Sequence, residues 1–212
     1  MKKLGMMAVL GGLLGLWVIP GASSAAGWSG GLKLGFNVAI IRGADARDFP
    51  YPDADWLLRF GFCGGGFVTL DFSESLSLQA EALLTRKGSS QVNLSFDYPT
   101  YRYSLVIDYL EVPLLIRLLT SPGSRSGFFL QAGPAMGFKL GGKLVRSGEP
   151  IPFDGLKSTD MGIVYGIGWL KKSGIVSELR YTMGLTKIVE IAGAPPLDIK
   201  NGVLSLTFGY VF

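Results

Sequence analysis

Histidine is absent from the 212-residue sequence, and cysteine occurs once, as Cys63. The absence of histidine excludes a serine–histidine nucleophile pair and every metal site that uses an imidazole ligand. A single cysteine excludes an intrachain disulfide. We therefore expect a protein that is not an enzyme and that carries no cofactor and no metal ion.

Charged residues are also scarce, at 17% of the chain, and the formal net charge is +4. Lys2 and Lys3 supply two of these charges, so the chain without its first residues carries only +2. This balance is too weak to predict a nucleic-acid partner. Mean hydropathy is high at +0.37, yet no long apolar segment follows the N-terminal region. The apolar residues must therefore be dispersed along strands instead of gathered in spanning helices.

The N-terminal residues have the organisation of a secretory signal peptide. Two lysines precede an apolar segment at 4–19, and a run of small residues follows at 22–26. We expect cleavage after Ala25 or one residue later, which gives a signal peptide at 1–25 and one mature domain at 26–212. An uncleaved membrane anchor is the alternative, and the run of small residues argues against it.

Residues 109–119, in the middle of the chain, alternate between two kinds of side chain. One parity is entirely apolar and comprises Leu110, Val112, Leu114, Ile116 and Leu118. The other parity includes Glu111, Pro113 and Arg117. Successive side chains of a β-strand point to opposite faces, so this pattern predicts a strand with one unbroken apolar face. A helix would scatter the two charges around its apolar stripe, and Pro113 would break it.

The same alternation recurs from Trp28 to the C-terminus and predicts eight strands. The alternating segments are 32–40, 58–72, 76–84, 109–119, 128–140, 161–169, 179–185 and 204–212. Long connections at about 43–55, 87–103 and 146–158 alternate with short turns. An even number of strands with short turns at one end and long loops at the other is typical of outer-membrane barrels. We predict an all-β fold, an eight-stranded antiparallel up-and-down transmembrane β-barrel with both termini in the periplasm.

Alternation alone also fits a soluble eight-stranded barrel with an apolar interior, and two features favour the inverse arrangement. The polar parity is rich in small residues, namely Gly35, Gly61, Gly65, Gly133, Ala135, Gly137, Gly162, Gly166, Gly168 and Gly184. Small residues suit the narrow interior of such a barrel. Aromatic residues cluster where strands meet the short turns, at Trp28, Phe72, Phe128, Trp169, Tyr210 and Phe212. This placement is typical of a membrane interface, so we expect the apolar parity to face lipid.

Three short motifs carry a family resemblance. They are Tyr-Leu-Glu-Val-Pro-Leu-Leu at 109–115, Gly133-Pro134, and Glu178-Leu179-Arg180-Tyr181 followed by Gly184-Leu185. With these motifs and a last strand that ends on Phe212, the chain resembles the outer-membrane β-barrel family of PorT-like proteins of Gram-negative bacteria. The resemblance implies the barrel fold, an outer-membrane location and recognition of the last strand by the barrel-insertion machinery. It supplies no catalytic residue, and some members of the family are associated with a protein-secretion apparatus.

Six charged residues on the polar parity form the candidate site, an interior charge network: Lys33, Glu81, Glu111, Arg117, Glu178 and Arg180. Buried charges need partners, so three carboxylates and three cations indicate salt bridges that fill the interior. An ion path, or a gate whose pairs exchange, is the alternative, but eight strands leave little lumen. Glu111 and Arg117 lie about 20 Å apart along their strand. Each therefore needs a partner on another strand, and Arg180 is a candidate for Glu111.

The sequence thus predicts a non-enzymatic integral outer-membrane protein with a structural or partner-docking role. The resemblance adds an association with a protein-secretion or envelope assembly, and a narrow channel for small solutes is the alternative. The expected partners are outer-membrane lipid including lipopolysaccharide, the barrel-insertion machinery at the C-terminal strand, and an envelope protein. Cations near the predicted mouth could contact lipopolysaccharide phosphates or simply be solvated, and they are Arg59, Lys139, Lys143 and Arg146.

Overall fold

The computed structural model describes residues 27–48, 56–92, 102–121, 126–151, 155–190, 195 and 197–212. The signal peptide predicted at 1–25 lies outside these residues and stays a prediction. The long strands are β1 (Gly27–Arg42), β3 (Arg59–Asp71), β4 (Leu76–Val92), β5 (Arg102–Leu119), β6 (Gly127–Arg146), β8 (Thr159–Leu170), β9 (Ile175–Gly184) and β10 (Lys200–Val211). The short elements are a 3-10 helix, η1 (Ala44–Asp48), and the strands β2 (Trp56–Leu57) and β7 (Glu149–Ile151).

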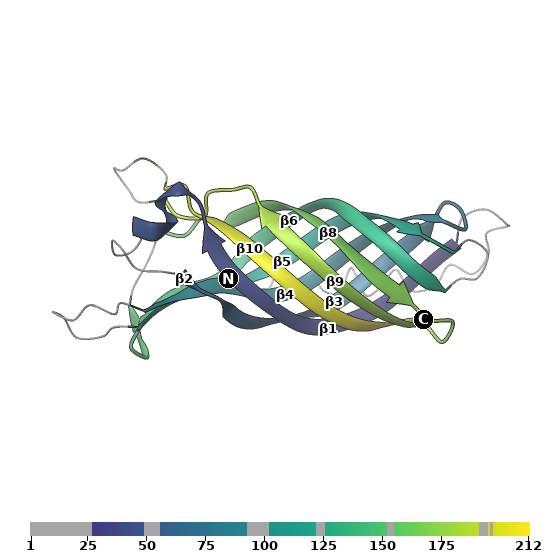
Figure 1. Cartoon of the computed structure of the whole chain (residues 1–212), viewed down its shortest axis with the longest axis horizontal. Helices are drawn as coiled ribbons and strands as arrows, with labels where there is room; N and C mark the ends of the chain where they lie inside the picture. The colour runs from purple at the N-terminus through teal and green to yellow at the C-terminus, as the bar shows by residue number, and fades with distance from the viewer. Residues whose placement is uncertain are drawn as a thin grey trace, which may run out of the picture.

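The long strands close into a barrel, because each pairs antiparallel with its neighbours and β1 pairs with β10 (Figure 1). Within the described residues this circuit contains eight strands, which confirms the predicted fold. Two short strands extend it, since β2 pairs with β4 beside β3, and β7 pairs with β6. A helix long and apolar enough to span a membrane is not found in the described part of the chain.

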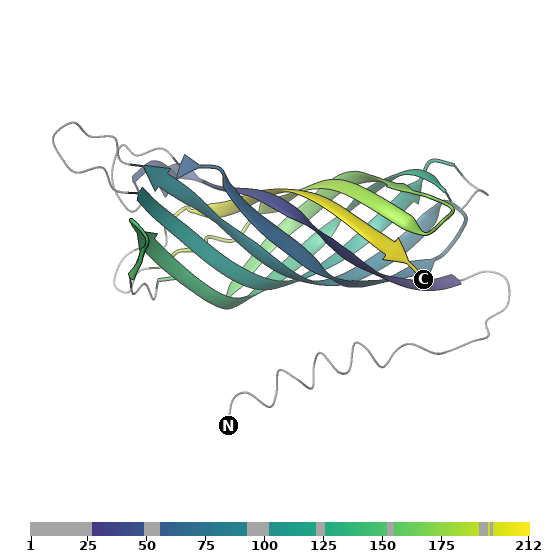
Figure 2. The same cartoon turned by 90° about the horizontal axis from the view of Figure 1, so that it is seen from below.

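The connections alternate in length as predicted. Short turns join β3 to β4, β5 to β6 and β8 to β9, and Figure 2 shows the C-terminus at the same end as the start of β1. One predicted boundary is wrong. The connection expected at 87–103 is strand at both ends, because β4 continues to Val92 and β5 begins at Arg102. The polar residues at 87–91 suggested a loop, but Lys87 and Ser89 lie on the interior parity of β4 and are 2% and 0% exposed.

A β-bulge separates the two halves of the β5–β6 pair. Asp108 lies opposite Gly141 and Tyr109 lies opposite Lys139, so Leu140 is the extra residue. An extra residue reverses the parity of the strand beyond it. Leu144 therefore points inward and is buried, although the alternation of the preceding segment places even positions outside.

The two faces of the wall follow the predicted parity. Leu115 and Arg117 are 0% and 7% exposed, whereas Ile116 between them is 55% exposed. The outer face of β1 is apolar from Trp28 to Ile40, about 40 Å along a strand. A barrel strand tilted by about 40° converts this length to a height of roughly 30 Å, close to the hydrocarbon thickness of a bilayer.

Glycine lies beside the charged residues of the interior. Lys33 is flanked in the strand register by Gly65 on β3 and Gly209 on β10, and Arg180 lies opposite Gly166 on β8. A Cβ on Gly166 would approach the Arg180 Cβ to 2.6 Å. The small residues of the polar parity therefore provide the space that long interior side chains occupy.

Candidate functional site: the charged interior of the barrel

A buried ion network lies in the half of the barrel nearer the short turns. Lys33 Nζ is 2.9 Å from Glu81 Oε1 and 2.7 Å from Glu178 Oε2, and Arg180 Nη1 is 2.7 Å from Glu81 Oε2. These side chains come from β1, β4 and β9, and all four are at most 5% exposed. We call this set the short-turn cluster. Since strands across the barrel contribute to it, the network ties the wall together through its interior.

Arg117 lies beside this cluster and is held differently. Its Nη1 donates to Gln79 Oε1 at 2.5 Å, and its guanidinium carbon lies 3.8 Å from the centre of the Phe129 ring. Within the described residues it has no carboxylate at ion-pair distance. Gln79 in turn donates to Glu81, so Arg117 is linked to the short-turn cluster through a neutral amide.

A second group, the loop-end cluster, lies nearer the long connections. Lys87 Nζ is 3.3 Å from Glu111 Oε1 and 3.4 Å from Asp160 Oδ2, and the Asn201 amide donates to Asp160 at 2.8 Å. The Lys87 ammonium also lies 5.2 Å from the centre of the Tyr109 ring. The predicted pairing of Glu111 with Arg180 is therefore wrong, since Lys87 is the partner of Glu111 and Arg180 binds Glu81.

Neutral polar side chains fill the interior between the short-turn cluster and the loop-end cluster. Asn37 donates to Thr85 Oγ1 at 2.7 Å and accepts a hydrogen bond from Ser205 at 2.8 Å. Cys63, the single thiol, is buried on the interior parity of β3 opposite Thr85. The interior at this level is thus filled by short polar side chains that bond one another.

An apolar lid covers the loop-end cluster. It comprises Ile41, Ala46, Leu105, Ile107, Tyr109, Leu144, Leu156, Ile188, Val189 and Ile199, with Leu197 packed against it. Isolated bridges join Val189 to Leu156 and to Leu197, and Lys139 Nζ donates to the Leu156 carbonyl. Two of the long connections therefore fold inward across the mouth.

One carboxylate fixes the rim of this lid. Asp198 pairs with Lys200 at 2.8 Å and accepts a hydrogen bond from the Ala44 amide at 3.2 Å. The hydrogen bond from Lys200, followed by that from Ala44, lowers the pKa of the Asp198 carboxyl. This carboxylate therefore ties η1 to the start of β10.

An apolar floor closes the opposite end of the interior. Phe67, Phe129 and Val176 are buried there, with Leu119, Leu170 and Val211 packed against them. Phe67 and Phe129 have room because glycines lie beside them: a Cβ on Gly31 would lie 2.3 Å from the Phe67 ring, and one on Gly168 would lie 2.2 Å from the Phe129 ring. The charged interior is thus enclosed between two apolar layers.

Hydrogen bonds from neutral side chains support the ion pairs. Gln79 donates to Glu81 and Thr207 donates to Glu178 Oε2, whereas Glu178 Oε1 is buried without a hydrogen-bond partner among the described residues. A buried ion pair stabilises a fold only when its remaining hydrogen-bonding groups are largely satisfied. Within the described residues, no group of histidine, cysteine, aspartate and glutamate side chains could hold a metal ion.

All six residues of the predicted network point into the barrel, but they belong to different units. Lys33, Glu81, Glu178 and Arg180 form one network, Arg117 lies beside it, and Glu111 belongs to the loop-end cluster. Sequence reasoning missed Lys87 and Asp160. Lys87 has the same parity as Glu81 on an uninterrupted strand, and this parity is the signal that could have revealed it.

Comparison with models of protein families identifies the family of this chain. A family model described as an outer membrane protein beta-barrel domain matches residues 22–190. The chain belongs to this outer-membrane β-barrel family. It is therefore a protein of the outer membrane, and its apolar outer wall faces lipid. No curated protein sequence matches the chain.

Solved structures of outer-membrane barrels share the fold of this family member. Neisserial surface protein A is 13% identical with a TM-score of 0.50, and the match covers 88% of this chain and 99% of that protein. Ail of Yersinia pestis, in complex with the heparin analogue sucrose octasulfate, is 16% identical with a TM-score of 0.46 over 87% and 99% of the two chains. OprG of Pseudomonas aeruginosa is 12% identical with a TM-score of 0.43 over 92% and 99%. At these identities the likeness concerns the fold alone.

Glu81→Gln tests the short-turn cluster. The substitution leaves Lys33 and Arg180 sharing one carboxylate, so we expect the free energy of unfolding to fall by about 3–5 kcal/mol. Denaturant unfolding in lipid vesicles measures this change. The matched control is Asp108→Asn, which removes the exposed Arg86–Asp108 pair and should cost less than about 1 kcal/mol. Equal losses in the two variants would contradict the importance of the buried network.

Proposed function

We propose that this chain is a non-enzymatic outer-membrane barrel with a sealed interior, and that it acts through its outer wall and long connections in a structural or partner-docking role. The observation that carries the proposal is the enclosure of the paired charges between the apolar lid and the apolar floor. The complete absence of histidine supports the non-enzymatic part. The resemblance to PorT-like proteins supports an association with a secretion or envelope assembly.

The proposed orientation places both ends of the barrel domain in the periplasm and the long connections outside the cell. Short turns on the periplasmic side and longer external loops are the usual arrangement in this class. Phe208 and Tyr210 lie on the outer face of β10 and Phe212 directly follows it, where the barrel-insertion machinery would bind the terminal strand. Aromatic side chains around the short turns, including the stacked pair of Phe128 and Trp169, suit an interfacial girdle.

The hairpin formed by β6 and β7 is the part of the loop end best suited to docking. Its turn consists of Ser147 and Gly148, both exposed and both with positive φ, which is typical of a tight two-residue β-turn. Within the described residues, β7 pairs with β6 alone, and the residue between its two β6-facing positions is Pro150, which offers a carbonyl but no N–H to an added strand. An envelope protein that contacts the exposed turn through side chains is therefore the partner this hairpin would accept.

Planar-bilayer recording separates the sealed barrel from the narrow channel. We expect no single-channel steps, because apolar clusters bound the charged interior at both ends and eight strands enclose little space. Heat-modifiable migration of the same sample in detergent gels serves as the folding control. Reproducible conductance steps from folded protein would contradict the sealed interior and favour a channel for small solutes.

Site-directed crosslinking in intact cells tests docking. A photo-reactive residue in place of Ser147 should give an adduct of defined mass with an envelope protein, because this exposed turn is the tip of the proposed docking hairpin. The matched control is Ser173, which is exposed in the short turn between β8 and β9. Adducts that are absent at Ser147, or identical at both positions, would contradict docking through the loop end.

A further inference from the structure

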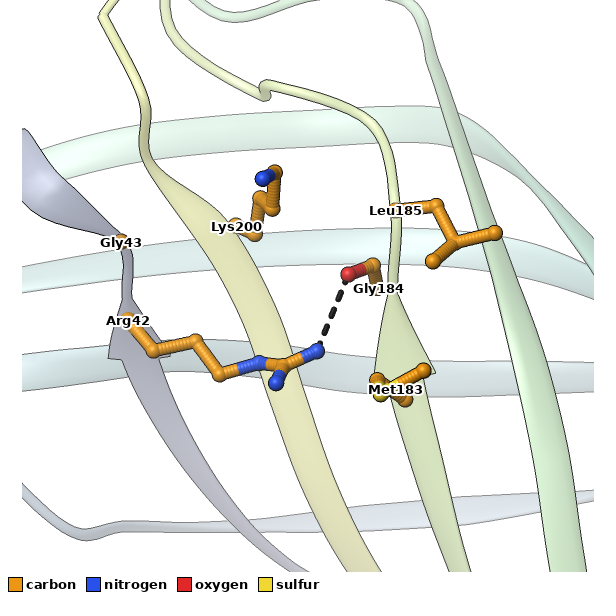
Figure 3. A pocket seen from close by; sticks show the side chains of 6 residues that line it. All are labelled: Arg42, Gly43, Met183, Gly184, Leu185 and Lys200. Carbon is orange, nitrogen blue, oxygen red and sulfur yellow. Dashed lines mark hydrogen bonds between the residues drawn. The ribbon is translucent and has the colours of Figure 1, made fainter.

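A pocket of about 330 Å³ lies on the outer wall close to the loop end of the barrel (Figure 3). Its lining combines two cations with apolar side chains and glycines: Arg42, Gly43, Met183, Gly184, Leu185 and Lys200. These residues come from the ends of β1 and β9 and the start of β10. The sealed interior and the docking hairpin do not include this pocket.

The Arg42 side chain is held flat against the wall by main-chain groups. Its Nη2 donates to the Gly184 carbonyl at 3.0 Å, and its Nε donates to the Asn201 carbonyl at 3.4 Å. Gly202 leaves room for this path, since a Cβ there would lie 3.4 Å from Arg42 Cδ. Within the described residues, Arg42 has no carboxylate at ion-pair distance. A positioned guanidinium therefore keeps its charge uncompensated on the outer wall.

Lys200 adds a second positive charge directly opposite. Arg42 and Lys200 are register partners across the β1–β10 pair, and like charges at such positions are unfavourable unless an anion lies near them. Asp198 neutralises Lys200 at 2.8 Å, but it forms no ion pair with Arg42. The surplus charge at this position suits an anionic ligand.

The position of the pocket along the barrel axis indicates which part of the membrane surrounds that ligand. Arg42 follows Ile40 on the outer face of β1, directly above the apolar stretch that begins at Trp28 and spans roughly 30 Å of height. Arg42 therefore lies at the level of lipid headgroups. Leu185, 50% exposed, and Met183 provide apolar surface beside it.

We propose that this pocket binds the phosphate group of a phosphorylated glycolipid from the outer leaflet. Arg42 is the main phosphate ligand, because a guanidinium makes two parallel charge-assisted hydrogen bonds to phosphate oxygens. Lys200, already paired with Asp198, lies beside this position, and an acyl chain of the same lipid lies against Met183 and Leu185. The inference rests on the orientation proposed above, in which the loop end of the barrel meets the outer leaflet.

Native mass spectrometry of the purified full chain in detergent tests this site with three probes: bis-phosphorylated lipid A, its dephosphorylated form and phosphatidylglycerol. We expect Arg42→Gln to weaken binding of the phosphorylated lipid A about tenfold, since the paired charge-assisted contact is lost. The matched control is Arg86→Gln. Arg86 also lies on the outer wall near the loop end, but Asp108 already neutralises it at 2.6 Å, so binding should equal that of the unchanged chain.

Three results would overturn the inference: equal losses in Arg42→Gln and Arg86→Gln, equal binding of the dephosphorylated lipid, or equally tight binding of phosphatidylglycerol. The last result would indicate a phospholipid site and a reversed orientation, whereas the crosslinking of Ser147 tests docking independently. If Arg42→Gln does not fold, Arg42→Lys carries the test, since it keeps the positive charge but loses one of the two parallel guanidinium contacts. About threefold weaker binding is then expected from the loss of one charged contact, and unchanged binding would contradict the site.

Discussion

Neutralisation of charge inside a narrow barrel is the constraint on which the rest of this structure depends. The buried charged residues of the described chain are four cations and four carboxylates: Lys33, Lys87, Arg117, Arg180, Glu81, Glu111, Asp160 and Glu178. Ions removed from water are stable only when they are paired and hydrogen-bonded. Because eight strands enclose little water, the partners must be side chains of other strands, and the wall is held in register by its own contents.

The need to hold paired charges inside a narrow barrel also explains where the glycines lie. Long charged side chains fit because glycines lie beside them in the register, and the two rings of the floor fit for the same reason. The interior is filled by these side chains and bounded by an apolar cluster at each end. The proposed function and the proposed lipid site therefore use the outer wall, with Arg42, and the hairpin of β6 and β7.

The fold and the orientation of side chains could be predicted from the sequence because both follow from a period of two. Residues 109–119 show this most clearly, since each parity lies on the face expected for it. The pairing of the charges could not be predicted, because it depends on the register between strands and on their closure into a ring. Glu111 binds Lys87, which begins a stretch that looked like a loop, and the bulge at Leu140 reverses a parity that the preceding residues establish. The lid combines residues from several connections, and no local pattern in the sequence brings them together.

The reactivity of the native thiol tests the sealed interior most directly. Cys63 is buried, on the interior parity of β3, between the two charged clusters. A water-soluble methanethiosulfonate reagent added to the protein in lipid vesicles should leave Cys63 unmodified, modify it fully after unfolding in urea, and react readily with Ser147→Cys in a Cys63→Ser background. Modification of Cys63 in the folded barrel at the rate seen for the exposed turn would show that water and solutes enter the interior, and would contradict the account.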